Sequence, residues 1–128
     1  MMFAPGFRIS WFDAAVMIAG IIVACIASAY AWWAGTVISF VVGHFFLFCN
    51  VFRIARKPEL IWAAVFIVLI GATVLTGMPG WIVAFSVSFI VAVLLIYLEM
   101  QKTSYHGIFW SKINPGLREW WEEQQSQK

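Results

Sequence analysis

Apolar residues dominate two long stretches of this chain, and turn residues interrupt each stretch near its middle. The 39 residues between Asp13 and Arg53 carry no formal charge, and neither do the 39 between Glu59 and Glu99. One membrane crossing needs about 20 apolar residues, so each stretch accommodates two helices and a tight turn. The sequence therefore predicts an all-α membrane protein with four transmembrane helices in two hairpins, near residues 11–33, 35–54, 58–76 and 81–99.

Local signals refine the ends of these helices. Trp32-Trp33-Ala34-Gly35 is predicted to be the turn of the first hairpin, and Gly77-Met78-Pro79-Gly80 the turn of the second. Ser10 and Asp13 have the spacing of a capping box at the start of the first helix.

Two alternatives concern the first helix and the symmetry of the chain. Residues 22–29 have features of a signal-peptide cleavage region, but Asp13 would then interrupt the apolar part of that signal. We therefore expect the first helix to remain in the chain. The equal lengths of the two stretches indicate symmetry of hydropathy, without a matching repeat of side chains.

All basic residues lie on one predicted side of the membrane. None lies in a hairpin turn; they are Arg8, Arg53, Arg56, Lys57, Lys102, Lys112, Arg118 and Lys128. The positive-inside rule predicts cytoplasmic termini, in a bacterial inner membrane or an equivalent plasma membrane. Arg56 and Lys57 in the middle loop are expected to contact anionic lipid headgroups.

Tryptophan residues gather at the predicted helix boundaries. Trp32, Trp33 and Trp81 are predicted to mark the outer interface, and Trp11 and Trp62 the inner one. Charged residues make up only 11% of the chain, less than half the share of a soluble domain. That composition excludes nucleic-acid binding and an ordinary cytosolic enzyme.

A polar stripe runs along the second predicted helix. At 100° per residue, Ser39, Asn50 and Arg53 fall on one face of it. These residues either pack against the first helix, whose small residues at positions 20, 24 and 28 permit close approach, or line a path for a substrate or an ion. The sequence leaves both interpretations open.

His44 is predicted near the middle of the membrane, away from that stripe. It could pack among its aromatic neighbours, contact a proton or a substrate, or bind haem or a metal. A second intramembrane histidine is missing from the sequence, so we predict neither a metal nor a cofactor. Cys25 and Cys49 lie in apolar runs and are expected to be buried free thiols.

Two acidic residues, Asp13 and Glu99, are predicted at the inner membrane boundary, where either could pair with Arg53. Glu99 stands at a helix C-terminus, where the helix dipole disfavours a negative charge. Lys102, three residues later, is placed to compensate it.

Residues 1–99 are predicted to form the transmembrane domain, and residues 100–128 a cytoplasmic tail rich in aromatic residues. Asn114 and Pro115 are expected to start a short amphipathic helix at the membrane interface. Trp120 and Trp121 lie on one side of that helix and are expected to dock it on the membrane or on a partner.

No motif for a nucleophile, a phosphate loop, a metalloprotease helix or paired catalytic carboxylates occurs in the sequence, so enzymatic activity is not expected. The sequence favours a non-enzymatic accessory or assembly subunit of a membrane complex. The alternative is a small oligomeric transporter or channel that uses the polar stripe, and a lipid- or quinone-linked enzyme ranks third. The expected partners are the lipid bilayer and either a second copy of the chain or a larger membrane complex.

Overall fold

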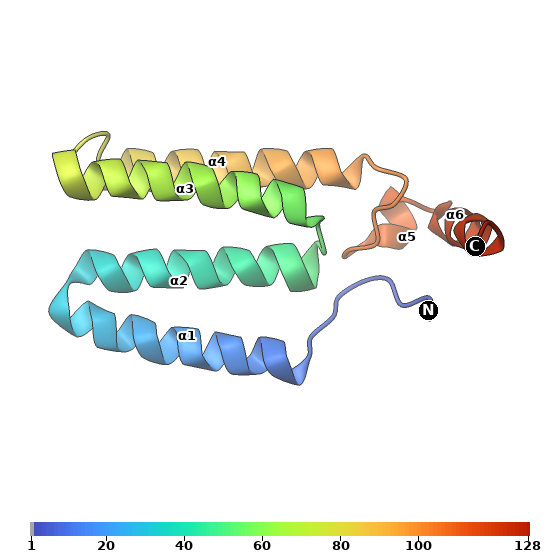
Figure 1. The fold of residues 1–128 in the computed structure, drawn as a ribbon, viewed down its shortest axis with the longest axis horizontal. Coiled ribbons are helices and arrows are strands. Elements are labelled where there is room, and N and C mark those ends of the chain that lie inside the picture. The colour runs from blue at the N-terminus through green and yellow to red at the C-terminus, as the bar shows by residue number, and fades with distance from the viewer. Residues whose placement is uncertain (1) are drawn as a thin grey trace. The chain divides into compact units, whose positions relative to one another are not determined.

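Four long apolar helices make up most of the computed structural model, which describes residues 2–128. They are α1 (Trp11–Tyr30), α2 (Trp32–Phe46) with its continuation η1 (Leu47–Val51), α3 (Arg56–Thr76) and α4 (Trp81–Met100), followed by the short helices α5 (Trp110–Ile113) and α6 (Leu117–Ser126) (Figure 1). Each long segment has 20 or 21 residues, which gives about 30 Å of helix, the thickness of a bilayer's hydrocarbon core. The chain is therefore an integral membrane protein with four apolar spans, and the predicted all-α fold is confirmed.

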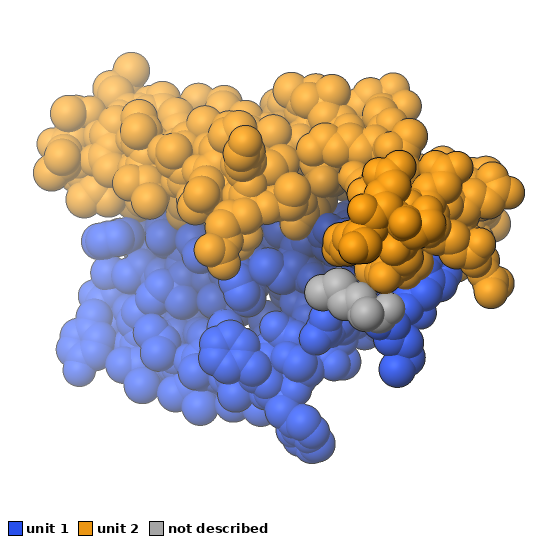
Figure 2. Space-filling model, turned by 45° about the vertical axis from the view of Figure 1, so that its right-hand side comes forward, with its two compact units in different colours: residues 1–53, 106–109 blue, residues 54–105, 110–128 orange. Residues whose placement is uncertain are grey.

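The chain divides into two compact units, each built on one hairpin (Figure 2). Unit 1 comprises the residues up to Arg53 together with His106–Phe109, and unit 2 comprises Ile54–Tyr105 together with Trp110–Lys128. In unit 1, α1 packs antiparallel against α2, and in unit 2, α3 packs antiparallel against α4 (Figure 1). The predicted pairing of the helices into two hairpins is confirmed.

The capping box at the start of α1 is also confirmed. The Asp13 backbone N–H donates to the Ser10 hydroxyl at 3.1 Å, and the Ser10 backbone N–H donates to Asp13 Oδ2 at 2.8 Å. Two amide groups that the first helical turn leaves unpaired are thereby satisfied.

The turn of the first hairpin lies earlier than predicted. α1 ends at Tyr30, and the single extended residue Ala31 (φ −154°, ψ 123°) separates it from α2. Trp32 and Gly35 were predicted to form the turn, but both belong to the first turn of α2. One extended residue is enough to reverse the chain here, so the glycine is not needed for the turn.

Gly35 instead allows close packing of the two helices. It is buried, and a Cβ atom added to it would lie 2.8 Å from the Ala24 carbonyl oxygen of α1. At Gly20 of α1, an added Cβ would lie 2.7 Å from the Val42 side chain of α2. The small residues of α1 therefore permit close approach, as predicted. Gly43 of α2 faces open space instead.

The turn of the second hairpin lies where it is predicted. Gly77 ends α3 in the left-handed conformation (φ 75°), and its amide donates to the Thr73 carbonyl at 2.9 Å. Glycine adopts this conformation without the steric cost of a Cβ atom. Gly80 (φ 100°) then precedes α4.

Aromatic packing joins α3 and α4 in the core of unit 2. Trp62 is 4% exposed, and its ring stacks on Phe66 with the centroids 5.0 Å apart. Its indole N–H donates to the Ser88 carbonyl at 2.9 Å. The ring predicted to mark the membrane boundary is thus buried between the two helices, because the Ser88 carbonyl satisfies its one polar group.

The loop after α4 is fixed by Asn114. The Asn114 side-chain amide donates to the carbonyls of Thr103 and Tyr105 at 2.6 and 3.1 Å. The last helix, α6, begins at Leu117 with Gly116 as its N-cap, so the predicted start at residues 114–115 is wrong. The loop carbonyls have no helical partner of their own, and Asn114 satisfies them instead of capping the helix.

Tyr105, in this loop, is expected to make the free energy of unfolding depend on pH in the alkaline range. Its side chain is buried, and burial raises the pKa of the phenol. The native state therefore keeps a proton that the unfolded state loses, starting near the ordinary tyrosine pKa of about 10. Stability should be unaffected below about pH 10 and should fall as pH rises through the raised native value, by up to about 1.4 kcal/mol per pH unit.

This dependence can be measured as the free energy of unfolding of wild type and Tyr105→Phe at about pH 9 to 11. The wild type should lose stability more steeply than the variant, which lacks the ionisable group. Equal slopes for the two proteins would contradict the effect of burial on Tyr105.

Candidate functional site

The end of α2 holds the N-terminal segment of the chain. α2 continues as the π-turn η1, and the Phe52 backbone N–H donates to the Leu47 carbonyl, five residues back, at 2.9 Å. Asn50 lies on this turn and Arg53 follows it. We call Asn50, Arg53 and the residues 4–8 that they hold the N-terminal clamp. Single π-turns inside α-helices occur often at functional sites, which makes the clamp the first place to look for function.

Asn50 is the buried centre of the N-terminal clamp, with 2% of its surface exposed. Its side-chain Nδ2 donates to the Arg8 carbonyl at 2.7 Å, and the Arg8 backbone N–H donates to the Asn50 carbonyl at 3.1 Å. Both polar groups of the Arg8 main chain are thereby paired. Asn50 Oδ1 is buried and accepts no hydrogen bond from residues 2–128.

Arg53 holds the start of the N-terminal segment. Its backbone lies in the left-handed region (φ 48°), which is uncommon for residues other than glycine. Its Nη1 donates to the carbonyls of Ala4 and Gly6 at 2.6 and 3.5 Å. Burial, and in second place the nearby charge of Arg8, lower the pKa of the Arg53 guanidinium. An arginine nevertheless stays protonated in a protein, so the clamp keeps this positive charge.

A segment that follows α4 in the sequence completes this part of unit 1. The Gly6 N–H donates to the His106 carbonyl at 2.7 Å, and the Ile108 N–H donates to the Val51 carbonyl at 2.8 Å. The Val51 carbonyl is available because the helix ends there. Sequence analysis missed these contacts because backbone groups make them. In this segment, the buried Gly107 is the residue that could have indicated a close approach of two backbones, because glycine has no side chain.

Ser39 does not join the N-terminal clamp. Its side chain is exposed on α2, eleven residues before Asn50 and thus about 16 Å away along the helix axis. The π-turn also changes the angular spacing of the residues that follow Leu47. The helical projection at 100° per residue, which placed Ser39 on one face with Asn50 and Arg53, is therefore not valid beyond Leu47.

His44 packs among aromatic rings of its own helix. It is 6% exposed, and its Nδ1 lies 2.8 Å from the Phe40 carbonyl oxygen. The ring centroid lies 4.1 Å from that of Phe40 and 6.0 Å from that of Phe48. Within residues 2–128, no three His, Cys, Asp or Glu side chains gather as metal ligands would.

Asp13 and Glu99 each have local partners. Asp13 Oδ2 accepts a hydrogen bond from the Ser10 hydroxyl at 2.7 Å. Glu99 forms the predicted ion pair with Lys102 at 2.7 Å and also accepts the Ala55 backbone N–H at 3.3 Å. Glu99 is almost fully buried, so these two donors offset the cost of removing its charge from water.

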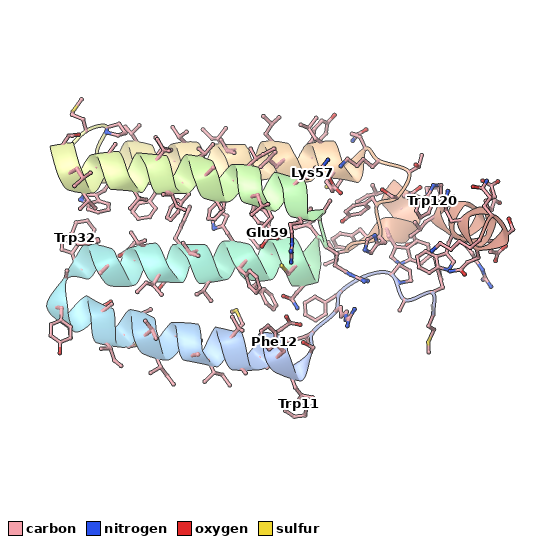
Figure 3. All side chains as sticks on the ribbon, in the orientation of Figure 1. Trp11, Phe12, Trp32, Lys57, Glu59 and Trp120 are labelled. Atoms are coloured by element: carbon pink, nitrogen blue, oxygen red, sulfur yellow. The ribbon has the colours of Figure 1, made fainter. Side chains whose placement is uncertain are left out.

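The remaining predicted site residues lie in unit 2. Arg56 and Lys57 are exposed in the first turn of α3, and Trp120 and Trp121 are half-buried on α6. Lys57 and Trp120 are labelled in Figure 3. The opposite side of α6 is charged and exposed, as the ion pair between Arg118 and Glu122 at 3.3 Å illustrates. The tail helix is therefore amphipathic.

No model of a known protein family, no curated protein and no solved structure matches this chain.

Proposed function

We propose that this membrane protein is a non-enzymatic accessory or assembly subunit of a larger membrane complex. One observation carries the proposal. Asn50 and Arg53, the most polar residues near the end of α2, bind carbonyl groups of the chain's own N-terminal segment. Groups that a transported ion or substrate would need are thus used to hold the protein together.

The alternative function, a small oligomeric transporter or channel, has less support. Such a protein needs polar side chains that follow one another along the membrane normal. Ser39 is exposed and about 16 Å from Asn50 along the helix. The Thr36 hydroxyl donates to the Trp32 carbonyl of its own helix at 3.0 Å, a bond that needs no polar path.

The surface that would contact the partner is the tail helix α6. Leu117 anchors the start of this helix in unit 2, where it is 1% exposed. Trp120 and Trp121 then present partly exposed rings beside a charged face. Aromatic rings with partial exposure are typical of the central contacts in protein interfaces.

The proposal places α6 in the cytoplasm. All eight basic residues lie outside the two hairpin turns, and this asymmetry supports cytoplasmic termini under the positive-inside rule. The membrane would be a bacterial inner membrane or an equivalent plasma membrane. A partner that binds α6 would then approach from the cytoplasmic side.

A fusion of green fluorescent protein to the C-terminus of the full chain tests orientation and assembly together. Under the proposal, the fusion fluoresces in cells, because this reporter matures in the cytoplasm. On a native gel of mild-detergent extracts, the fluorescent band should run as a complex that contains one defined other protein. Replacing both Trp120 and Trp121 with alanine should shift most of the signal to the free protein, because interface tryptophans are each worth about 2 kcal/mol or more.

The control replaces Glu119 and Glu123, on the opposite, exposed side of the same helix, with glutamine, and it should leave the complex intact. A dark fusion would contradict the orientation. A homo-oligomer without any other protein, together with ion or solute flux in liposomes, would replace the accessory function with the transporter.

A further inference from the structure

Two arginine side chains belong to the N-terminal clamp in unit 1. The main chain of Arg8 is fixed by its two hydrogen bonds to Asn50, while its side chain is exposed. Arg53 uses Nη1 for the carbonyls of Ala4 and Gly6. No acceptor among residues 2–128 bonds its Nε or Nη2 groups, so three of its N–H donors remain available.

The Arg8 main chain pairs with Asn50, three residues before Arg53, so both arginines lie at the same end of the hairpin. Asp13 is the only acidic residue in the sequence of unit 1. Its Oδ2 is held by the Ser10 hydroxyl and amide at 2.7 and 2.8 Å, and it forms no ion pair within 4 Å of either arginine. Unit 1 therefore keeps one positive charge in excess at this end of its hairpin.

This end of the hairpin is where phospholipid headgroups would lie. Arg8 precedes the first span by three residues, and Arg53 follows the second span by two. Trp11 is 93% and Phe12 72% exposed at the start of α1, and Trp11 projects outward from the hairpin (Figure 3). Exposed aromatic rings at a span's end are typical of the headgroup layer.

We propose that Arg8 and Arg53 together bind the phosphate of an anionic phospholipid at this end of the first hairpin. Guanidinium groups match phosphate oxygens with paired N–H donors, and two of them can share one phosphate. The hydrogen bonds of the N-terminal clamp hold the main chain of Arg8 and the side chain of Arg53 in place before the lipid arrives, which lowers the entropy lost on binding. Trp11 and Phe12 would flank the lipid at the same depth.

The test is a titration of the full-length protein in a neutral detergent with phosphatidylglycerol, followed by native mass spectrometry. Phosphatidylcholine, whose headgroup has no net charge, is the comparison lipid. The wild type should bind phosphatidylglycerol more tightly than phosphatidylcholine. Arg8→Gln should weaken phosphatidylglycerol binding about tenfold, since it removes charge-assisted hydrogen bonds and retains the main-chain bonds to Asn50.

Arg118→Gln is the matched control, because it removes the same charge from the exposed face of α6. It should leave the affinity for phosphatidylglycerol unchanged. Equal weakening by the two variants would overturn the proposal in favour of diffuse electrostatic attraction, and an unchanged Arg8→Gln would overturn it directly. Displacement of the lipid by a similar concentration of inorganic phosphate would assign the site to free phosphate and overturn the lipid as ligand.

A thermal unfolding measurement of Arg8→Gln guards against loss of the fold. Its midpoint should equal that of the wild type, because the exposed side chain makes no hydrogen bond to residues 2–128. If the midpoint fell, Arg8→Lys would replace Arg8→Gln in the lipid titration, since lysine keeps the positive charge but lacks the planar guanidinium with its paired N–H donors. The proposal expects Arg8→Lys to bind phosphatidylglycerol more weakly than the wild type.

Discussion

Replacing Gly35 with alanine is expected to destabilise the first hairpin by about 1–3 kcal/mol, the usual cost of overfilling a packed site. The added methyl group would overlap the Ser28 hydroxyl and lie 2.8 Å from the Ala24 carbonyl oxygen. The Ser28 hydroxyl can rotate away, although it would lose its 2.8 Å hydrogen bond to Ala24. The carbonyl belongs to the backbone of α1 and cannot rotate, so the two helices must separate.

Thermal or SDS-induced unfolding of the purified protein in detergent would measure this loss. Gly43→Ala is the matched control, because an added Cβ there meets nothing within 4 Å. That variant should be as stable as the wild type or slightly more stable, since alanine is the better helix former. If Gly35→Ala were as stable as Gly43→Ala, the close contact between α1 and α2 would be refuted.

Replacing Asn50 with leucine is expected to release the N-terminal segment and to cost about 1–3 kcal/mol of stability. Leucine has a similar size but cannot donate to the Arg8 carbonyl, which Asn50 binds at 2.7 Å. The carbonyl would be left without its donor in a partly buried place. Trypsin should then cut after Arg8 many times faster than in the wild type, and mass spectrometry of the time course would detect the cleavage.

Ser39→Ala is the control for this experiment, and it separates the two functions. The exposed Ser39 side chain contributes nothing to the N-terminal clamp, so its replacement should change neither stability nor the rate of cleavage. A transport path along α2 would instead require both residues for flux. A slow, wild-type rate of cleavage in Asn50→Leu would show that this side chain does not hold the segment.

Gly35 and Asn50 act at different levels of the structure. Gly35 determines how closely the two spans of unit 1 approach each other, and Asn50 determines whether the chain before α1 is ordered. If both variants behave as expected, Asn50, which a transporter would need for its path, has a structural role instead. A structural role is consistent with an accessory subunit.

Much of the fold follows from the sequence alone. The four spans, the capping box of Ser10 and Asp13, and the turn at Gly77 depend on neighbours in the sequence: apolar runs of sufficient length, a serine three residues before an acid, and a glycine in a left-handed turn. The ion pair of Glu99 and Lys102 is local in the same way, because residues three apart on a helix are neighbours.

Only the tertiary structure decided what the polar and small residues do. Glycine is typical of turns, but Gly35 packs against α1. Tryptophan is typical of the membrane interface, but Trp62 is buried in the core of unit 2. Asn50 and Arg53 bind carbonyl groups more than 40 residues away in the sequence. Backbone carbonyls are the same in every residue, so no sequence pattern marks which of them a side chain will find; the π-turn at the end of α2 and the course of the N-terminal segment determine that.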